Sequence, residues 1–400
     1  MRKPDRRRFL TTTAAIAGLT SCSSKDQPPA AQASLGAHMR PYGEPSPYEQ
    51  QPVRVIRELT ASKGTGSSRT PLQDLYGTIT PSPLHYERHH AGVPSIDPAQ
   101  HQLLIHGMVD KPLTFTPAEI HRFPSFSRIY FLECGGNMVG DLAGNPPPTV
   151  QASHGLVSGT EWTGVPLATI LREAGLQPEA KWIIAEGADH SRMARSIPIE
   201  KCLDDTLIAY GQNGEALRPE QGYPLRLLVP GWEGNVSVKW LRRLFVTDKP
   251  AMSVKETAYY SELRPDGKAE QFSFVMEARS VITKPSGGQS LQGPGFYEIT
   301  GLSWTGTGKI AKVEVSTDGG KSWAEAKLQQ PVLDKALVRF LYPWQWDGKD
   351  AVLQSRCTDE TGYTQPTRDQ LIATRGPHSG YHYNAIKSWY VRADGSVKHV

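Results

Sequence analysis

Short apolar runs separated by turn residues dominate the chain between residues 71 and 270. Residues 101–107, 182–185 and 225–231 each have the length and composition of a strand that ends at a turn. Residues 167–174 instead repeat apolar positions at helical spacing and are followed by Gly175, a common residue after a helix end. Strands that alternate with short helices predict a β-rich, mixed α+β domain in this part of the chain.

The pattern becomes more regular after about residue 271. Residues 310–316 alternate apolar and polar positions, and residues 317–320 (TDGG) predict a hairpin turn after them. Residues 337–341 and 352–357 continue the strand pattern. Strands at this spacing are typical of an immunoglobulin-like β-sandwich, so we expect two domains, residues 71–270 and residues 271–400.

Length, composition and charge are consistent with two folded domains. A chain of 400 residues exceeds what one ordinary core supports, and 38% hydrophobic with 21% charged residues is typical of a globular protein. A net charge of +4 without a long basic run argues against a nucleic-acid partner. Residues 34–70 are rich in Pro, Ser, Gln and Gly and predict an extended linker or arm.

The first 33 residues have the features of an export signal. Arg6 and Arg7 precede a weakly apolar stretch, residues 11–20, that is too short to span a bilayer. This arrangement predicts a twin-arginine signal and export to the periplasm. Residues 19–22 resemble a lipoprotein processing site that would leave lipid on Cys22, whereas residues 31–33 offer conventional cleavage and soluble release.

Four cysteines are present, at positions 22, 134, 202 and 357. They allow one disulfide at most in the mature protein, and whether Cys202 pairs with Cys357 is left open. The sequence contains neither Cys-x-x-Cys nor Cys-x-x-Cys-His, so it carries no motif for a covalently attached haem or a zinc knuckle.

Cys134 is the most informative cysteine. It follows an apolar, strand-like run and precedes Gly135, Gly136 and Asn137, which predicts a sharp turn with positive φ at the glycines. A thiolate held at a strand end suits a single bond to a soft metal centre. The alternative is a buried core cysteine that behaves as a small hydrophobe.

Two further segments carry candidate chemistry. Residues 86–90 (YERHH) cluster arginine and histidine, which suit a phosphate, a pterin ring or an oxyanion. Zinc is a competing idea, but neighbouring histidines on a strand point to opposite faces, and a polar surface loop is the other alternative. Arg375 is expected after a strand and before a turn, where an arginine is commonly a solvated side chain.

Six segments in a fixed order then resemble the sulfite oxidase family of molybdenum enzymes, over roughly residues 86 to 389. They are Arg88-x-His90 and residues 134–137, 196–198, 222–226, 238–240 and 375–376. Residues 133–137 and 266–278 are similar in particular to the SoxC-type subfamily of sulfane dehydrogenases. The resemblance implies a sulfite-oxidase-type molybdopterin domain followed by an immunoglobulin-like domain of the dimerisation type.

The resemblance also implies roles for individual residues. Cys134 would bind molybdenum, Arg88 and Arg375 would face the oxo groups and the substrate anion, and Tyr260 would be the active-site tyrosine unless a one-residue slip selects Tyr259. The residues implied to hold or line the molybdopterin are Tyr86, Glu87, Arg88, His89, His90, Asp189, Gln221, Arg226, Ser237, Val238 and Lys239.

Two positions depart from the family pattern. Met138 stands where vertebrate and plant sulfite oxidases have an arginine, which implies a substrate pocket with one cation fewer. Gln221 stands where the family has a pterin-contacting histidine, and glutamine can still donate and accept hydrogen bonds.

The resemblance therefore implies a periplasmic, molybdenum-dependent sulfane dehydrogenase subunit of a thiosulfate-oxidising system. Such a subunit would oxidise sulfur bound to a carrier protein and pass electrons to a c-type, dihaem cytochrome, as a homodimer within a hetero-oligomer. A periplasmic sulfite dehydrogenase is the alternative. A cofactor-free exported scaffold, whose β-sandwich binds partner proteins, is the hypothesis from another class.

Overall fold

The structure is a computed structural model that describes residues 38–50, 52–58, 63–377 and 380–400. The predicted export signal and Cys22 lie outside the described residues. The chain forms two units, residues 1–51 and residues 52–400. Residues 38–50 of the first unit contain bends and a turn but no helix or strand. The second unit contains all the helices and strands described below.

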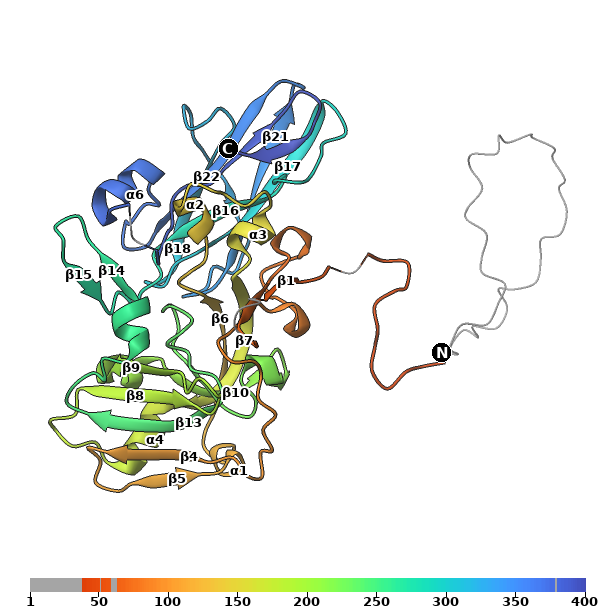
Figure 1. The fold of residues 1–400 in the computed structure, drawn as a ribbon. Helices are drawn as coiled ribbons and strands as arrows, with labels where there is room; N and C mark the ends of the chain where they lie inside the picture. Colours follow the sequence, from red (N-terminus) through yellow and green to blue (C-terminus); the bar gives the residue numbers. More distant parts are fainter. Residues whose placement is uncertain (1–37, 51, 59–62, 378–379) are drawn as a thin grey trace, which may run out of the picture. The chain divides into compact units, whose positions relative to one another are not determined.

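The first large sheet of the second unit has the strand order β5-β4-β13-β8-β9 (Figure 1). Its strands are β4 (Leu103–Gly107), β5 (Leu113–Phe115), β8 (Trp182–Gly187), β9 (Ala194–Pro198) and β13 (Leu241–Thr247). Only β13 and β4 pair in parallel, and the other pairs are antiparallel. Helices α4 (Leu167–Ala174) and α5 (Ile199–Asp204) contribute side chains to the same apolar core.

A second sheet has the order β11-β10-β7-β6, with β12 paired to β10. Its strands are β6 (Phe126–Glu133), β7 (Val157–Pro166), β10 (Leu207–Gln212), β11 (Glu215–Ala216) and β12 (Arg226–Leu228). All eight residues of β6 pair with β7. This long ladder fixes the end of β6, and therefore the position of Cys134, the next residue.

Smaller elements complete this half of the unit. Two hairpin-sized sheets are formed by β1 (Val55–Glu58), β2 (Gly66–Arg69) and β3 (Glu87–His89), and by β14 (Ser261–Leu263) and β15 (Ala269–Gln271). The short helices are α1 (Pro117–Ile120), α2 (Val139–Leu142), α3 (Val150–His154), the 3₁₀ turns η1 (Leu72–Asp74), η2 (Ser82–Leu84) and η3 (Pro219–Gln221), and the π-helix η4 (Lys255–Tyr259).

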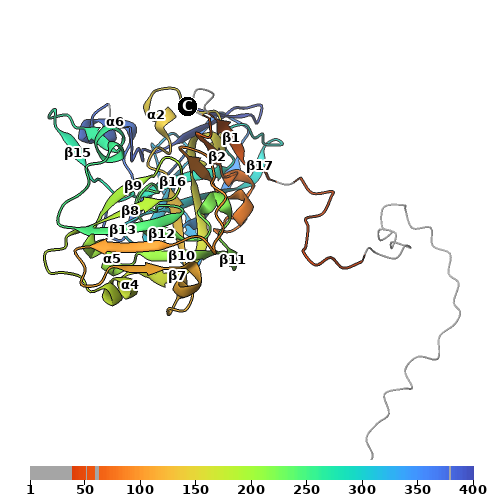
Figure 2. The same cartoon turned by 60° about the horizontal axis from the view of Figure 1, so that its bottom comes forward.

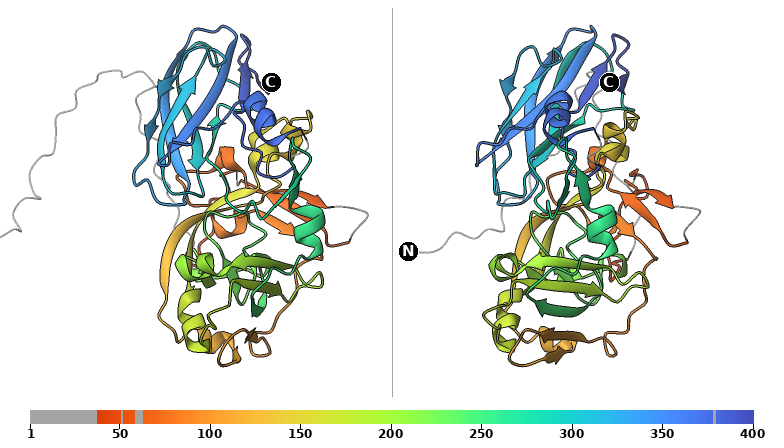
Figure 3. Two further views of the ribbon diagram at one scale, coloured as in Figure 1. Left: turned by 90° about the vertical axis from the view of Figure 1, so that its left-hand side faces the viewer. Right: turned by 60° about the vertical axis from the view of Figure 1, so that its left-hand side comes forward.

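The C-terminal part is a two-sheet β-sandwich (Figures 1 and 3). One sheet contains β16 (Arg279–Lys284), β17 (Gly295–Trp304), β20 (Lys327–Leu328) and β21 (Val338–Trp346). The other contains β18 (Ile310–Ser316), β19 (Ala324–Glu325), β22 (Ala351–Asp359), β23 (Ser388–Val391) and β24 (Val397–His399). Helix α6 (Arg368–Arg375) lies between β22 and β23 in the chain. The sheets bury one core that includes Trp304, Phe340 and Trp389.

The predicted mixture of a β-rich α+β domain and a β-sandwich is confirmed. The helix predicted at residues 167–174 is α4, and Gly175 follows it with φ 71°. The strand predicted at residues 310–316 is β18. The hairpin predicted after it is confirmed, because β18 pairs antiparallel with β19. The connection includes residues 317–320, and Asp318 accepts there from Ser316 and Ser322.

Two local expectations differ from the structure, and the question of a Cys202–Cys357 disulfide is answered by it. Part of the predicted linker forms β1 and β2, because β2 pairs with the edge strand β3 and β1 then extends that sheet. Arg375 ends a helix instead of following a strand, because Thr367 and Gln370 form a capping box that starts α6. Cys202 and Cys357 are free thiols, and they belong to the separate cores of the first domain and of the sandwich.

The two halves of the second unit meet at the end of β6. The Glu133 carboxylate accepts a hydrogen bond from Arg279 Nη1 of β16 at 2.5 Å and another from Trp304 Nε1 of β17 at 2.7 Å. Glu133 is fully buried, so these charge-assisted contacts are made away from solvent. Strand positions in the sandwich therefore help to fix the residue that precedes Cys134.

Candidate cofactor pocket and active site

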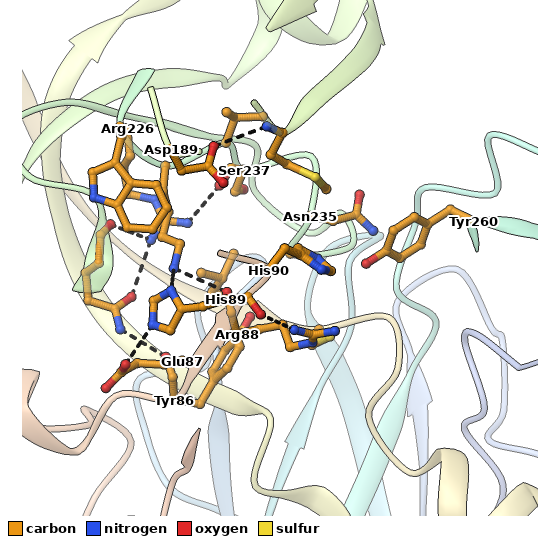
Figure 4. Close-up of a pocket in the computed structure, with 18 residues that line it drawn as sticks. Tyr86, Glu87, Arg88, His89, His90, Asp189, Arg226, Asn235, Ser237 and Tyr260 are labelled. Atoms are coloured by element: carbon orange, nitrogen blue, oxygen red, sulfur yellow. Dashed lines mark hydrogen bonds and ion pairs between the residues drawn. The ribbon is translucent and has the colours of Figure 1, made fainter. Parts of the chain in front are cut away.

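A pocket opens among residues from distant parts of the chain (Figure 4). Its walls come from β3, the end of β6, the turn after β8, the segment that precedes β13, and the end of η4. Figure 2 labels β8 and β13, the strands next to two of the segments that line it. Because the lining residues extend along the chain from Tyr86 to Tyr260, the pocket exists only in the folded chain.

Thirteen of the fourteen residues proposed from the sequence line this pocket. They are Tyr86, Glu87, Arg88, His89, His90, Cys134, Asp189, Gln221, Arg226, Ser237, Val238, Lys239 and Tyr260. The lining residues that the sequence reasoning did not select are Leu132, Met193, Gly234, Asn235 and Trp240. Gly234 and Asn235 are separated from the Ser237–Lys239 segment by one residue, Val236, so their position in the sequence was the available signal.

Arg375 is the exception. It does not line the pocket; its guanidinium pairs with Glu277 and, at 3.1 Å, with Glu262. The expectation that it faces the substrate is therefore not supported by its position. The capping box of α6 and two nearby carboxylates place the arginine in an ion-pair cluster, where its charge is compensated.

Cys134 is the sulfur ligand that the pocket offers. Its amide donates to Leu156 O at 3.0 Å, and Asn137 N donates back to Cys134 O at 2.9 Å, which closes the turn. The side chain is 9% exposed. Burial raises the pKa of the thiol, whereas the Gly136 amide and the Arg88 charge act in the opposite direction. A cation at this site would favour the thiolate further.

The turn after Cys134 differs from the expected one. Neither Gly135 nor Gly136 has a positive φ; Met138 does, at 65°. Gly135 is needed for a close approach instead, because a Cβ there would lie 3.2 Å from Glu233 Oε2 and 3.5 Å from Tyr381 Cδ1. Met138 therefore adopts a left-handed backbone conformation that residues other than glycine seldom adopt.

Met138 also lies outside the pocket. Its side chain is buried against Leu371, Tyr383 and Ala385, and Arg279 Nη1 lies 4.0 Å from its sulfur. Its replacement of a family arginine therefore does not simply remove a cation from the pocket wall. The side chain at this position packs against the C-terminal part of the chain.

Two buried cations make the pocket suitable for an anionic group. Arg226 donates to Gln221 O at 3.1 Å and Ser237 O at 3.0 Å, and Lys239 donates to Glu220 O at 3.0 Å. Neither forms an ion pair with a carboxylate among the described residues. Burial lowers the pKa of Arg226 to about 10 and that of Lys239 well below its usual value. An anion such as a phosphate would relieve this desolvation cost.

His89 connects Lys239 to a carboxylate (Figure 4). Lys239 Nζ lies 2.9 Å from His89 Nδ1, and His89 Nε2 lies 2.7 Å from Glu87 Oε2. Since the ammonium donates to Nδ1, the neutral ring carries its proton on Nε2 and donates it to Glu87. Burial, assisted by the Lys239 charge, lowers the pKa of His89 to about 3. The imidazole is therefore a neutral link in the pocket wall.

Tyr260, not Tyr259, lines the pocket. Tyr260 is buried, whereas Tyr259 is 50% exposed. In Figure 4 Tyr260 and Asn235 lie at the end of the pocket away from Arg226. Burial raises the pKa of Tyr260 well above its usual value, so its phenol is a hydrogen-bond donor at every ordinary pH.

The structure does not support a zinc site. Among the described residues, no group of three or more His, Cys, Asp and Glu side chains could hold a metal ion. His89 and His90 both line the pocket, but His89 is engaged by Lys239 and Glu87. The pocket thus provides one sulfur ligand and a polar cradle, as expected for a metal brought by an organic cofactor.

No helix within the described ranges has the length and apolarity needed to cross a membrane.

Comparisons with known proteins agree with this site. The family model for the oxidoreductase molybdopterin binding domain matches residues 90–255, and the model for the Mo-co oxidoreductase dimerisation domain matches residues 270–388. The chain belongs to the sulfite oxidase family of molybdopterin oxidoreductases. Its fold matches the crystal structure of the sulfane dehydrogenase SoxCD from Paracoccus pantotrophus with a TM-score of 0.90 and 46% identity, over 92% of this chain and 96% of that chain.

Two curated relatives show the breadth of the family. Mitochondrial sulfite oxidase from Drosophila melanogaster is 34% identical over 311 residues, which are 71% of this chain and 53% of that protein. The NADH nitrate reductase from Solanum lycopersicum is 32% identical over 347 residues, which are 76% of this chain and 38% of that protein. The chain thus spans about half or less of the length of these relatives.

The pocket fits the cofactor of this family, molybdenum bound to molybdopterin. Cys134 would bind the metal, and the uncompensated cations Arg226 and Lys239 would hold the phosphate group. Asp189 and Gln221 offer hydrogen bonds to a pterin ring. The cofactor would supply two-electron redox chemistry coupled to oxygen-atom transfer, and the chain's residues bind it and orient the substrate.

Proposed function

We propose that this protein is the molybdenum-containing subunit of a sulfane dehydrogenase that oxidises sulfur attached to a carrier protein. The observation that carries the proposal is its likeness to the sulfane dehydrogenase SoxCD, at 46% identity over nearly the full length of both chains. The curated relatives, which are about one third identical, include both sulfite oxidases and nitrate reductases. They therefore support molybdopterin-dependent redox chemistry but do not identify the substrate.

The pocket residues have complementary tasks in such a reaction. Arg88, whose positive charge acts on the Cys134 thiol, would attract an anionic sulfur group and stabilise the charge that develops on its oxygen atoms. The Tyr260 phenol, kept protonated by burial, would donate a hydrogen bond to the same oxygen atoms. Lys255, whose Nζ lies 3.4 Å from His90 Nδ1, would add positive charge at the same edge, whereas burial lowers the pKa of His90 to about 3 and keeps its ring neutral.

We assign the electron acceptor to a separate c-type cytochrome, because the sequence contains no Cys-x-x-Cys-His motif. A dihaem protein has two haem groups and would therefore accept both electrons of one oxidation. The match to a dimerisation domain at residues 270–388 supports a homodimer of this chain within the larger assembly. The twin arginines at positions 6 and 7 support a periplasmic location, with lipid on Cys22 as a possible anchor.

The test compares two substrates on the complex purified from its native host. Carrier protein bearing a thiol-bound sulfane sulfur should be oxidised efficiently with cytochrome c as acceptor. Free sulfite should be oxidised at least tenfold less efficiently, measured as kcat/KM. Efficient oxidation of sulfite with no turnover of the carrier would contradict the proposal.

The second candidate is a periplasmic sulfite dehydrogenase. It is favoured by the 34% identity to mitochondrial sulfite oxidase across 71% of this chain. Both candidates require the same cofactor and differ in the size of the reacting group that must enter the pocket. The same assay therefore separates them.

A further inference from the structure

His382 is a fully buried histidine next to the Cys134 turn, and it does not line the pocket. Its backbone amide donates to Gly135 O at 3.1 Å, and its own φ is 58°, a conformation that non-glycine residues seldom adopt. Strained backbone at a buried ionisable residue is common at functional sites. The sequence reasoning did not select this residue, because nothing near it in the sequence marks it.

Two carboxylates flank the ring, one on each nitrogen. Glu233 Oε2 lies 3.6 Å from His382 Nε2, and Glu277 Oε2 lies 3.5 Å from His382 Nδ1. Ser273 Oγ lies 3.0 Å from Nε2. Within the described part of the chain, Glu233 Oε2, His382 Nδ1 and Glu277 Oε2 are all buried without a hydrogen-bond partner.

The side chains of Glu233, His382 and Glu277 thus form a row of buried atoms, which is unusual in a native structure. Leaving one buried polar atom unpaired costs about 1–3 kcal/mol, and such atoms are rare enough that each asks for a reason. The separations exceed ordinary hydrogen-bond lengths by about half an ångström. A small shift of the imidazole ring therefore brings it within hydrogen-bond distance of Glu233 or of Glu277, without a requirement to bond both at once.

The inner end of the row adjoins the pocket. Glu233 is buried, and its Oε2 lies 3.2 Å from the position that a Cβ on Gly135 would occupy, one residue after Cys134. Its Oε1 accepts from Arg195 Nη2 at 2.9 Å, and Arg195 in turn lies over the Tyr260 ring. The two residues that follow Glu233, Gly234 and Asn235, line the pocket.

The outer end of the row reaches solvent. The Glu277 side chain is 23% exposed, whereas His382 and Glu233 are fully enclosed. Its Oε1 pairs with Arg375, the last residue of α6, which leaves Oε2 facing the imidazole. The row therefore leads from the Cys134 turn to the surface through one ring.

We propose that Glu233, His382 and Glu277 form a proton relay from the active-site pocket to solvent. The inference rests on the proposed function, in which water supplies the oxygen atom: RS⁻ + H₂O → RSO⁻ + 2 H⁺ + 2 e⁻. One S–O bond forms, two O–H bonds break, and the electrons go to the cytochrome acceptor. The two protons must leave the reacting centre, and an imidazole can accept a proton at one nitrogen while it releases one from the other.

The variant that tests the relay is His382→Gln in the complete complex. Glutamine retains a hydrogen bond to Ser273 but cannot exchange protons as an imidazole does. We expect kcat at saturating substrate to fall about tenfold, with KM within a factor of two, molybdenum content unchanged and a larger solvent deuterium isotope effect. Imidazole added to His382→Ala should restore part of the rate, which a purely structural role would not allow.

His101→Gln is the matched control. His101 is a buried histidine of the first domain, its Nε2 lies 2.9 Å from Leu241 O, and neither residue lines the pocket. Its replacement should leave kcat and the isotope effect within a factor of two. An unchanged kcat and isotope effect in His382→Gln, or a loss of rate in loaded His382→Ala that imidazole does not reverse, would overturn the relay.

A second readout needs neither cofactor nor turnover. In cofactor-free protein with ¹⁵N-labelled histidine, the ring signals of His382, identified by their loss in His382→Gln, should shift in Glu277→Gln and in Glu233→Gln. Ring signals that respond to neither change would show that the carboxylates do not share protons with the imidazole.

The outcomes keep the relay separate from the proposed substrate. If the wild-type complex oxidises sulfite and not carrier-bound sulfane, the proposed function is wrong. The same comparison of variants then runs on sulfite, whose oxidation also takes oxygen from water and releases two protons. Loss of rate in His382→Gln on either substrate supports the relay.

Discussion

The guanidinium of Arg195 lies 4.8 Å above the centre of the Tyr260 ring. Arg195 is fully buried and also donates to Glu233 at 2.9 Å, so its guanidinium contacts both a carboxylate and the phenol ring. A cation over an aromatic face is attractive, and a desolvated one contributes about 2 kcal/mol. The ring that faces the pocket is therefore positioned by a residue outside the pocket.

This arrangement predicts different effects for two neighbouring tyrosines. Tyr260→Phe should keep the ring over Arg195 but lose the hydroxyl in the pocket, so kcat should fall about 10- to 100-fold with normal molybdenum content. Tyr259→Phe is the control, because Tyr259 is half exposed and lies outside the pocket lining. Steady-state kinetics of both loaded variants measure the difference. Equal losses would contradict the assignment.

The buried cations predict a defect in cofactor retention. Arg226→Gln removes a charge that faces the pocket without a carboxylate partner, and the bound cofactor should be lost at least about tenfold more readily. Arg339→Gln is the matched control, because Arg339 is also buried and donates to Gly77 O and Leu75 O, outside the pocket lining. Metal and pterin content per protein after dialysis distinguishes the two. Full retention by Arg226→Gln would show that the charge serves folding instead.

Met138→Arg tests the effect of placing at position 138 the arginine that the sulfite oxidase resemblance implies there. Met138 is buried beside Leu371 and lies 4.0 Å from Arg279 Nη1, so an arginine there would meet a like charge in a closed space. We expect a loss of about 3 kcal/mol or more in folding free energy and no gain in sulfite binding. Met252→Arg is the control, since Met252 is exposed and also has positive φ. Urea unfolding and a sulfite titration measure both properties; tighter sulfite binding in a stable variant would refute the prediction.

The burial of His85 predicts how the free energy of unfolding depends on pH. Its ring is fully buried, Nδ1 lies 2.9 Å from Tyr86 O, and burial lowers its pKa to about 3. Between pH 6.5 and pH 3 the unfolded chain binds a proton that the folded chain does not, so stability falls as the pH falls through this range. From pH 6.5 to pH 5 this single group contributes a loss of about 2 kcal/mol.

The corresponding variant is His85→Asn. Its unfolding free energy should fall about 2 kcal/mol less than that of the wild type over the same pH change. His190→Asn, at an exposed position, should follow the wild type. Urea unfolding of cofactor-free protein at pH 6.5 and pH 5 provides the comparison. Parallel pH dependence in all three proteins would show that folding does not lower the pKa of His85.

Strands, the helix at residues 167–174 and most of the pocket residues were predictable because their signals are local. Alternation, a glycine stop and short motifs such as residues 134–137 depend only on neighbouring residues. The predictions failed where long-range pairing decides the outcome. Residues 55–58 and 66–69 have no strong pattern of their own, and they become strands because β3 offers an edge.

Side-chain direction was the other property beyond the reach of the sequence. Arg375 matches a family motif, but α6 delivers it to Glu262 and Glu277 instead of the pocket. Met138 follows the cysteine motif directly, yet its positive φ turns the side chain into a small core with Tyr383. In both cases the neighbours that decide the direction lie more than 90 residues away.

The sequence by itself determined the two-domain β-rich class, because composition and the spacing of apolar residues carry that information. Short motifs also identified Cys134 as a thiolate ligand and the polar residues able to hold a phosphate and a pterin. Only the tertiary structure decided which of these residues share one pocket, and which buried groups stand behind it. The reason is physical: burial, the pairing of charges and the approach of Glu233, His382 and Glu277 depend on segments that meet only when the chain has folded.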